Sequence, residues 1–407
     1  MEKKKGYSIR TWKYTLLSSE NEFFYKTEDY FRDIVGFYFD LLSRREELWN
    51  LNMFQIQRGL EILTVAGRDG RVPEVELPYH NVPVYFRRAA IDKAATAAKT
   101  CLASYMEEDK ANAGKLDLQK VFPQKVDATV TFYKGMYKDL TDKKVTLKLW
   151  DGENWVWKKY PLKGRKLPSD GISMSPNLVK YKHFYMLHVP VKLPVDDIRN
   201  AKSRMLKGDK ICSLQFTNTD VFTVCCVMDN AGKQQAVHFC RGGDMYRYQC
   251  NNILKKIQCS EKFTKNDKET QSNKKHYVHL RNLSEYYAHK VSREVIDFCC
   301  NNKVKLIILP EYEEEFSSLV QYRCGMYSPI YLSARIRRYL KYKAWVQGIL
   351  ILEVGAQNTS DHCFYCGSDI KKKRDTYFCC NDHRGNRFLN SARNLGQKCI
   401  DDFRCKQ

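Results

Sequence analysis

The sequence predicts an α+β protein of several domains, in which a β-barrel with a helical insertion precedes a second mixed domain. Apolar residues switch along the chain between a period of two, typical of strands, and a helical spacing. A chain of 407 residues is long enough for two or three domains. Closely spaced cysteines near the C-terminus add a small metal-binding module to this plan.

The N-terminal half predicts the barrel and its helical insertion. Residues 7–17 alternate and are rich in β-branched and aromatic side chains, which predicts a first strand. Helical spacing follows over 27–51 and 84–106, on either side of a loop over 67–83 that Gly and Pro interrupt. Period two then returns, with strands at 145–150, 155–157 and 181–189. We therefore expect a barrel over 1–26 and 120–205, with a helical lobe over 27–119.

The C-terminal half has a different order of elements. Three consecutive strands are expected at 211–216, 222–228 and 236–239. A helix near 283–299 then leads into a buried strand over 305–310, followed by a helix over 330–346 and a strand over 349–354. Three antiparallel strands followed by helix–strand alternation is the order of an RNase H-like domain. We expect this domain to cover 206–357 and 387–407.

The charge balance indicates a polyanionic partner. Lys and Arg total 69 against 47 Asp and Glu, a formal net charge of +22. Such an excess in a composition typical of folded proteins favours nucleic-acid binding. No apolar segment follows the charged N-terminus and no apolar run reaches transmembrane length, so no membrane partner is expected. The 16 cysteines are accordingly expected to be reduced thiols of a cytoplasmic protein.

Two short-spaced pairs of cysteine and histidine predict a zinc ribbon over 358–386. Zinc in structural sites takes four nitrogen or sulfur ligands in a tetrahedron, and four protein ligands leave no position open for catalysis. The second pair joins His383 to one of two adjacent cysteines, of which the second is preferred. The predicted ligands of this structural Zn²⁺ are Cys363, Cys366, Cys380 and His383, with Cys379 as the alternative to Cys380.

The segment Leu389–Leu395, which follows the ribbon, resembles the last catalytic segment of the RuvC nuclease domain in TnpB proteins and compact type V CRISPR effectors. The resemblance extends from about Tyr181 to the C-terminus, whereas the N-terminal half matches only in architecture. It implies a wedge-like barrel with a recognition lobe and a RuvC domain that carries the zinc ribbon. It also implies a bacterial, nucleoid-associated protein with a guide RNA and a double-stranded DNA target. A monomer and a homodimer both remain open.

The resemblance also implies three catalytic carboxylates, of which the chain retains one. RuvC-like nucleases hold two divalent ions between such acids. The two Asp positions carry Gln215 and Phe388, and Glu311 alone is retained. Because Mg²⁺ is held largely by anionic oxygen, productive Mg²⁺ binding is not expected. A working nuclease would need relocated acids, for which Asp220 and Asp382 are the candidates.

The leading hypothesis is therefore an RNA-guided DNA-binding protein that occupies its target without cleavage and represses transcription. One alternative is an active RNA-guided endonuclease with relocated acids. Another is an unguided zinc-ribbon accessory protein of a transposon that binds nucleic acid. The candidate nucleic-acid contacts are basic residues in three segments, namely Arg87, Arg88, Lys163, Arg165, Lys166, Arg335, Arg337, Arg338, Lys341 and Lys343.

Overall fold

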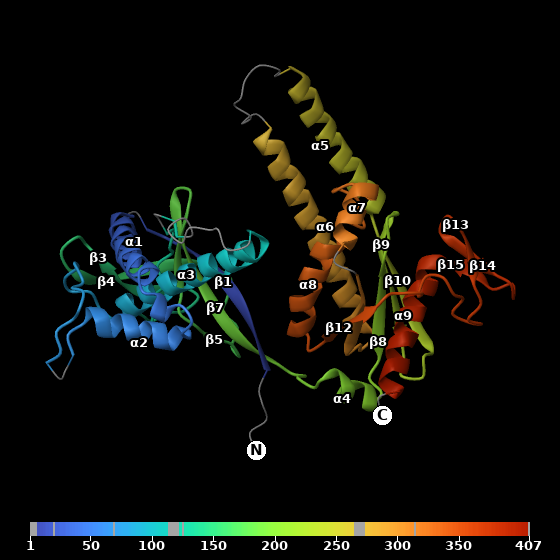
Figure 1. Cartoon of the computed structure of the whole chain (residues 1–407), viewed down its shortest axis with the longest axis horizontal. Helices are drawn as coiled ribbons and strands as arrows, with labels where there is room; N and C mark the ends of the chain where they lie inside the picture. The colour runs from blue at the N-terminus through green and yellow to red at the C-terminus, as the bar shows by residue number, and fades with distance from the viewer. Residues whose placement is uncertain are drawn as a thin grey trace. The chain divides into compact units, whose positions relative to one another are not determined.

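The computed structural model of the chain describes residues 6–18, 21–67, 70–112, 122–123, 126–263, 273–312 and 315–405. They form two compact units (Figure 1). The first comprises Ile9–Leu193, and the second comprises Met1–Ser8 together with Pro194–Gln407. Residues 113–119, the predicted end of the helical lobe, lie outside the described residues.

A seven-stranded sheet, curled into a half-barrel, is the frame of the first unit. Its strand order is β2-β3-β4-β1-β7-β5, and β6 also pairs with β7. The predicted strand over 181–189 is in fact two strands, because Lys182 adopts a φ of 52° and the chain reverses there, so that Tyr181 pairs with Phe184. The strands are β1 (Gly6–Leu16), β2 (Tyr137–Lys138), β3 (Lys144–Trp150), β4 (Trp155–Gly164), β5 (Ile172–Ser173), β6 (Asn177–Tyr181) and β7 (Phe184–Val195).

Helices α1 (Glu22–Ser43), α2 (Met53–Thr64) and α3 (Val84–Asn112) and the short 3₁₀ helix η1 (Glu46–Leu48) complete this unit. Helix α1 packs against α3 and β3, and it shares one hydrophobic core with the sheet. Helix α2 is missing from the sequence prediction, because it buries only one residue per turn, Ile56, Leu60 and Thr64. The structure therefore joins the expected barrel and helical lobe through a common core, and the finer division at 27–119 stays a prediction.

A five-stranded sheet with the order β10-β9-β8-β11-β12 organises the second unit. Strand β9 is antiparallel to both β8 and β10, whereas β11 is parallel to both β8 and β12. This arrangement confirms the RNase H-like order predicted from the sequence. The strands are β8 (Ile211–Phe216), β9 (Val221–Met228), β10 (Gln234–Arg241), β11 (Leu306–Glu311) and β12 (Leu350–Gly355).

Helices cover both faces of this sheet. Helices α5, α6 and α8 share a core with Cys212 and Leu214 of β8, whereas α9 shares another core with Ile211. Alternate residues of each strand therefore face different helical layers. The sequence analysis predicted α6 and α8 as helices and none of the other helices of this unit. The bounds are α4 (Ala201–Leu206), α5 (Gly243–Phe263), α6 (Lys274–Asn301), α7 (Phe316–Cys324), α8 (Ser333–Val346) and α9 (Arg387–Arg404).

A small sheet of three strands lies in the sequence between β12 and α9, in the red part of the chain in Figure 1. Its strands are β13 (Ile370–Lys373), β14 (Thr376–Cys379) and β15 (Arg384–Asn386). Residues 194–205, which the sequence analysis assigned to the barrel, are grouped with the second unit. No helix within the described ranges has the length and apolar content that a membrane span needs.

Candidate functional site

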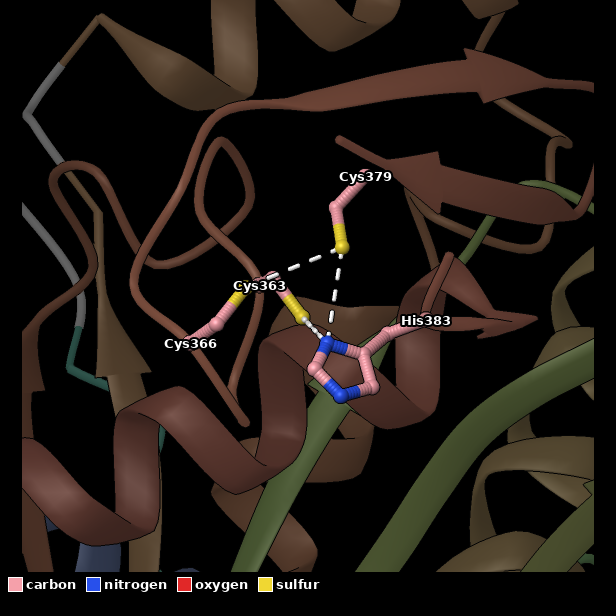
Figure 2. Close-up of side chains that lie close together, drawn as sticks. All are labelled: Cys363, Cys366, Cys379 and His383. Carbon is pink, nitrogen blue, oxygen red and sulfur yellow. Dashed lines mark hydrogen bonds between the residues drawn. The ribbon is translucent and has the colours of Figure 1, made fainter. Parts of the chain in front are cut away.

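Four metal-ligating side chains converge beside the small sheet (Figure 2). They are Cys363, Cys366, Cys379 and His383, and their candidate ligand atoms all lie within 4.8 Å of one another. The Sγ atoms of Cys366 and Cys379 are 3.7 Å apart, and His383 Nδ1 lies 3.7 Å from Cys363 Sγ and 3.5 Å from Cys379 Sγ. Tetrahedral zinc, with bonds of about 2.3 Å to sulfur and about 2.0 Å to nitrogen, separates two sulfurs by about 3.8 Å and sulfur from nitrogen by about 3.5 Å. The Cys₃His cluster therefore has the dimensions of a zinc site.

Two tight turns bring these ligands together. In the first turn, the N–H of Gly367 donates to the carbonyl of Cys363 at 2.8 Å, and Gly367 has a φ of +72°, which glycine adopts without strain. In the second turn, the N–H of Cys379 donates to the carbonyl of His383 at 3.0 Å. Each turn thus carries two ligands toward one point.

The structure places Cys379, the alternative, and not the preferred Cys380, beside the other three predicted ligands. On β14, Tyr377 is buried and its hydroxyl lies 4.0 Å from Cys363 Sγ, and Cys379 follows two residues later on the same face. Cys380 lies beyond the end of the strand, is exposed, and its thiol lies 3.8 Å from the side-chain oxygen of Asn381. Both cysteines have a sequence spacing to His383 that suits a zinc site. Only their position relative to β14 distinguishes them.

Hydrogen bonding at the cluster favours a metal-binding thiolate. Zinc binds the thiolate form of cysteine. The side chain of Ser368 lies 3.5 Å from Cys366 Sγ, and hydrogen bonds, chiefly from Ser368, lower the pKa of Cys366 to about 5. Cys366 is therefore ready to ligate a cation at neutral pH.

The segment Leu389–Leu395, identified by its resemblance to a catalytic motif, supports the metal cluster. Asn390 of α9 accepts the N–H of Phe364 at 2.9 Å and donates to the carbonyl of His362 at 2.7 Å. Asn394, one turn later, donates to the carbonyls of Thr359 and His362. The two asparagines thus hold the turn that contains Cys363 and Cys366 against α9.

The three positions matched to catalytic acids lie toward one end of the five-stranded sheet. Gln215 and Glu311 come near the carboxyl ends of β8 and β11, which are parallel and therefore end at the same edge. Phe388 lies in the first turn of α9. The hydroxyl of Ser213 donates to the carbonyl of Ala392 at 2.6 Å, so the N-terminal turn of α9 lies toward the Gln215 end of β8.

Strand alternation separates Gln215 from Glu311. Gln215 follows Ser213 by two residues and so belongs to the α9 face of the sheet. On β11, Ile308 lies in the core under α9 and Leu309 in the core under α5, α6 and α8. Alternation therefore assigns Pro310 to the α9 face and Glu311 to the opposite face.

The register of the two strands leads to the same result. Ile308 and Ser213 are the last paired residues of the two strands, and extending this parallel register by two residues sets Pro310 level with Gln215. The predicted remnant Glu311 lies one residue beyond the position that is level with Gln215. Pro310 occupies that position and is buried. The α9 side of this edge thus carries a glutamine, a proline and a phenylalanine, none of which is an anionic ligand.

The two acids considered for relocation both lie outside the helices and strands. Asp220 accepts the N–H groups of Gly242 and Asp244, at 3.3 and 3.4 Å, where α5 begins. Asp382 lies in the second zinc turn with a φ of 57°. Within the described residues, the groups of three or more metal-ligating side chains are the Cys₃His cluster and a second one, His238, Cys240 and Glu294.

The predicted nucleic-acid contacts on α8 have partners within the second unit. Glu285 of α6 pairs with Arg335 at 3.2 Å and with Arg338 at 3.8 Å. The ammonium of Lys343 donates to the carbonyl of His289 at 2.9 Å, and burial lowers the pKa of Lys343 to about 8. These three cations join α8 to α6.

The other two predicted cations of α8 join it to the sheet. Glu353 of β12 pairs with Arg337 at 3.0 Å and with Lys341 at 2.9 Å. The nearby carboxylates thus account for the basic face of α8 without a nucleic acid. A role of these residues in nucleic-acid binding stays a prediction.

Arg87 and Arg88 also have an internal partner. Glu61 of α2 pairs with Arg88 at 3.0 Å and lies 3.5 Å from Arg87, whose side chain is only 13% exposed. This group of charges ties α3 to α2. Its arrangement favours a structural role for both arginines.

The segment around Lys163, Arg165 and Lys166 is exposed and borders a basic pocket of about 490 Å³. The indole N–H of Trp12 donates to the carbonyl of Lys166, and the hydroxyl of Tyr14 donates to the carbonyl of Arg165. Sequence reasoning missed the contribution of β1, because its cations alternate with ordinary strand residues. The pocket is lined by Arg10, Thr11, Trp12, Lys13, Arg165, Lys166 and Pro168.

Two family models match parts of the chain. The Aq_aa04 family matches residues 8–151, and the Cas12f1-like TNB domain matches residues 334–395, which include the Cys₃His cluster. No curated protein matches the sequence.

Two solved structures resemble nearly the whole chain. One is the Cas12f1–sgRNA–target DNA complex, with 12% identity, a TM-score of 0.56 and coverage of 92% of this chain and 82% of that chain. The other is the mini-RNA-guided endonuclease CRISPR-Cas_phi3, with 8% identity, a TM-score of 0.57 and coverage of 97% and 93%. At such identities the likeness concerns the fold, and it confirms the resemblance to compact type V effectors that the sequence motifs indicated.

Proposed function

We propose that this chain, which has the fold of the compact type V effectors, is an RNA-guided DNA-binding protein that does not cleave its target. The observation that supports the proposal is that Gln215 and Phe388 replace two of the three expected acids, while strand alternation assigns Pro310, and not Glu311, to the α9 side of the sheet edge. Two-metal cleavage needs anionic ligands for both cations, and Gln215, Pro310 and Phe388 supply none.

The fold and the charge support a nucleic-acid partner. The structures that resemble nearly the whole chain include one with a guide RNA and target DNA. In proteins of that kind, base pairing reads the sequence, while the protein holds the backbones in a positively charged channel. A net charge of +22 and the exposed basic pocket beside Trp12 suit this task.

Occupancy of the target is the proposed output. A protein that forms a stable RNA–DNA hybrid without cutting stays bound and obstructs RNA polymerase at a promoter. Repression of transcription follows from such binding without any further partner. The Cys₃His cluster is proposed to hold a structural Zn²⁺ whose four protein ligands leave no open position.

The decisive experiment uses the RNA that copurifies with the full chain. That RNA is sequenced, and a DNA duplex library containing its matched target is incubated with the complex and Mg²⁺. We expect stable binding to the matched duplex, none to a scrambled duplex, and intact DNA in both. Target cleavage that disappears in Glu311→Ala or Asp220→Ala would overturn the proposal in favour of relocated acids, and purification without any RNA would favour the unguided alternative.

A further inference from the structure

The second group of metal-ligating side chains lies on the face of the RNase H-like sheet opposite α9. His238 and Cys240 belong to β10, Glu294 belongs to α6, and one candidate ligand atom from each lies within 4.8 Å of the others. His238 Nε2 is 2.7 Å from Glu294 Oε1. The set offers one nitrogen, one sulfur and one oxygen.

The fold aims the three side chains at one another. His238 and Cys240 are two residues apart on a strand and therefore share a face. Cys240 contributes to the core beneath α6, which packs against β10. The His238 ring also stacks on Phe298 of α6, with ring centroids 5.2 Å apart and planes at 28°. The imidazole is thus oriented by an interaction that leaves its Nε2 directed at Glu294.

We propose that His238, Cys240 and Glu294 bind a second zinc ion, with a fourth coordination position left for water. Imidazole, thiolate and carboxylate are the three zinc ligands of proteins, and a thiolate in the set disfavours Mg²⁺ and Ca²⁺. Cys240 is fully buried, whereas the side chains of His238 and Glu294 are 35% and 32% exposed. The ion can therefore enter from solvent and reach the thiol.

Binding requires only a small rearrangement. The 2.7 Å between His238 and Glu294 is a hydrogen-bond distance, and two ligands about 2.0 Å from one tetrahedral ion lie about 3.3 Å apart. The two side chains therefore separate slightly as the ion replaces the shared proton. Cys240 loses its proton on binding, so affinity falls as the pH is lowered.

Such an ion would link the edge strand β10 to helix α6. Strand β10 is the outer strand of the five-stranded sheet and carries two of the ligands. Helix α6 carries the third and belongs to the hydrophobic core on that face. Zinc that binds only the folded arrangement stabilises it, so the melting temperature is expected to rise with zinc concentration.

The test is the zinc content of the full-length protein after equilibration with micromolar zinc and removal of free metal. Wild type is expected to hold two zinc ions per chain, and His238→Ala and Glu294→Gln one each. His279→Ala is the matched control, because His279 is an exposed histidine on the same helix, and it should hold two.

A second measurement guards against variants that lose structure. Circular dichroism of metal-free wild type and His238→Ala should be the same, and added zinc should raise the melting temperature of wild type more than that of the variant. One zinc per chain in wild type, two in His238→Ala, or an equal thermal shift in both proteins would each overturn the proposal. The result is independent of RNA and DNA, so it does not depend on the proposed function.

Discussion

At the scale of single residues, the phase of a strand decides which of two adjacent cysteines joins the Cys₃His cluster. Cys379 is the last residue of β14 and faces the cluster, whereas Cys380 begins the turn and is exposed. A shift of one residue moves a side chain to the other face of a strand. The two thiols thus have the same chemistry, and they differ in whether they face the cluster.

Replacing each cysteine in turn tests this assignment. Cys379→Ser removes one of four ligands and is expected to cost the ribbon its zinc, whereas Cys380→Ser should retain it. The measurement is zinc released to a colorimetric chelator under a mild challenge. Faster zinc release from Cys380→Ser than from Cys379→Ser would show that the ribbon uses the other thiol.

The same one-residue phase applies to the positions matched by resemblance to catalytic acids. Extending the register of β8 and β11 sets Pro310 level with Gln215, and strand alternation assigns Glu311 to the opposite face. Restoring a metal site therefore needs an acid at position 310, not only at 215 and 388.

We expect Gln215→Asp, Pro310→Glu and Phe388→Asp together to create a measurable Mg²⁺ site. The double variant Gln215→Asp with Phe388→Asp is the control and should bind Mg²⁺ at least about tenfold more weakly, because it lacks the third carboxylate. Titration calorimetry compares them. Equal binding by the double variant, lost again on adding Glu311→Ala, would make Glu311 the relevant acid.

At the scale of elements, one buried arginine of α4 bonds to the backbone just before β11 and just before β12. Arg204 is fully buried and donates hydrogen bonds to the backbone carbonyls of Asp197, Arg199, Lys305 and Gly348. Lys305 directly precedes β11, and Gly348 lies between α8 and β12. This side chain therefore fixes where two strands of the sheet begin.

Arg204→Met is expected to lower the free energy of unfolding by about 3–5 kcal/mol, because it removes four hydrogen bonds of a buried side chain and its ion pair with Asp197. Lys202→Met is the matched control, since Lys202 is exposed on the same helix and its loss should cost less than about 0.5 kcal/mol. Urea unfolding followed by circular dichroism measures both. Similar midpoints for the two variants would show that the buried network contributes little.

The basic helix α8 shows that the role of a charged side chain depends on its partners in neighbouring elements. Four of its cations pair with Glu285 of α6 or Glu353 of β12, which links α8 to these two elements. Ion pairs of this kind require carboxylates that are distant in sequence. A pattern within one helix cannot reveal them.

At the scale of the whole molecule, the excess of positive charge favours binding to nucleic-acid backbones. The exposed pocket beside Trp12 concentrates four cations, Arg10, Lys13, Arg165 and Lys166. The contacts that Trp12 and Tyr14 make to this segment go to backbone carbonyls. Substitution of the Arg165 and Lys166 side chains therefore leaves these contacts in place.

Arg165→Glu with Lys166→Glu is expected to weaken RNA binding about tenfold or more at physiological salt and to reduce the salt dependence of the affinity. Lys134→Glu with Lys143→Glu makes the same change in net charge at exposed positions that do not line the pocket and should weaken binding less than about threefold. Fluorescence anisotropy over a salt series measures both. An equal loss in the two variants would mean that overall charge, and not this pocket, sets the affinity.

The sequence by itself determined the RNase H-like strand order, the zinc-ribbon module and three of the four cluster ligands, because periodicity and short spacings are local properties. Tertiary structure alone decided that Cys379 joins the cluster, that Gln215 and Glu311 belong to different faces of the sheet by alternation, and that four cations of α8 have carboxylate partners. It also brought His238 and Cys240 to Glu294, more than 50 residues away in sequence. The physical reason is that strand phase, register and helix packing are fixed by contacts between distant segments, which no local pattern contains.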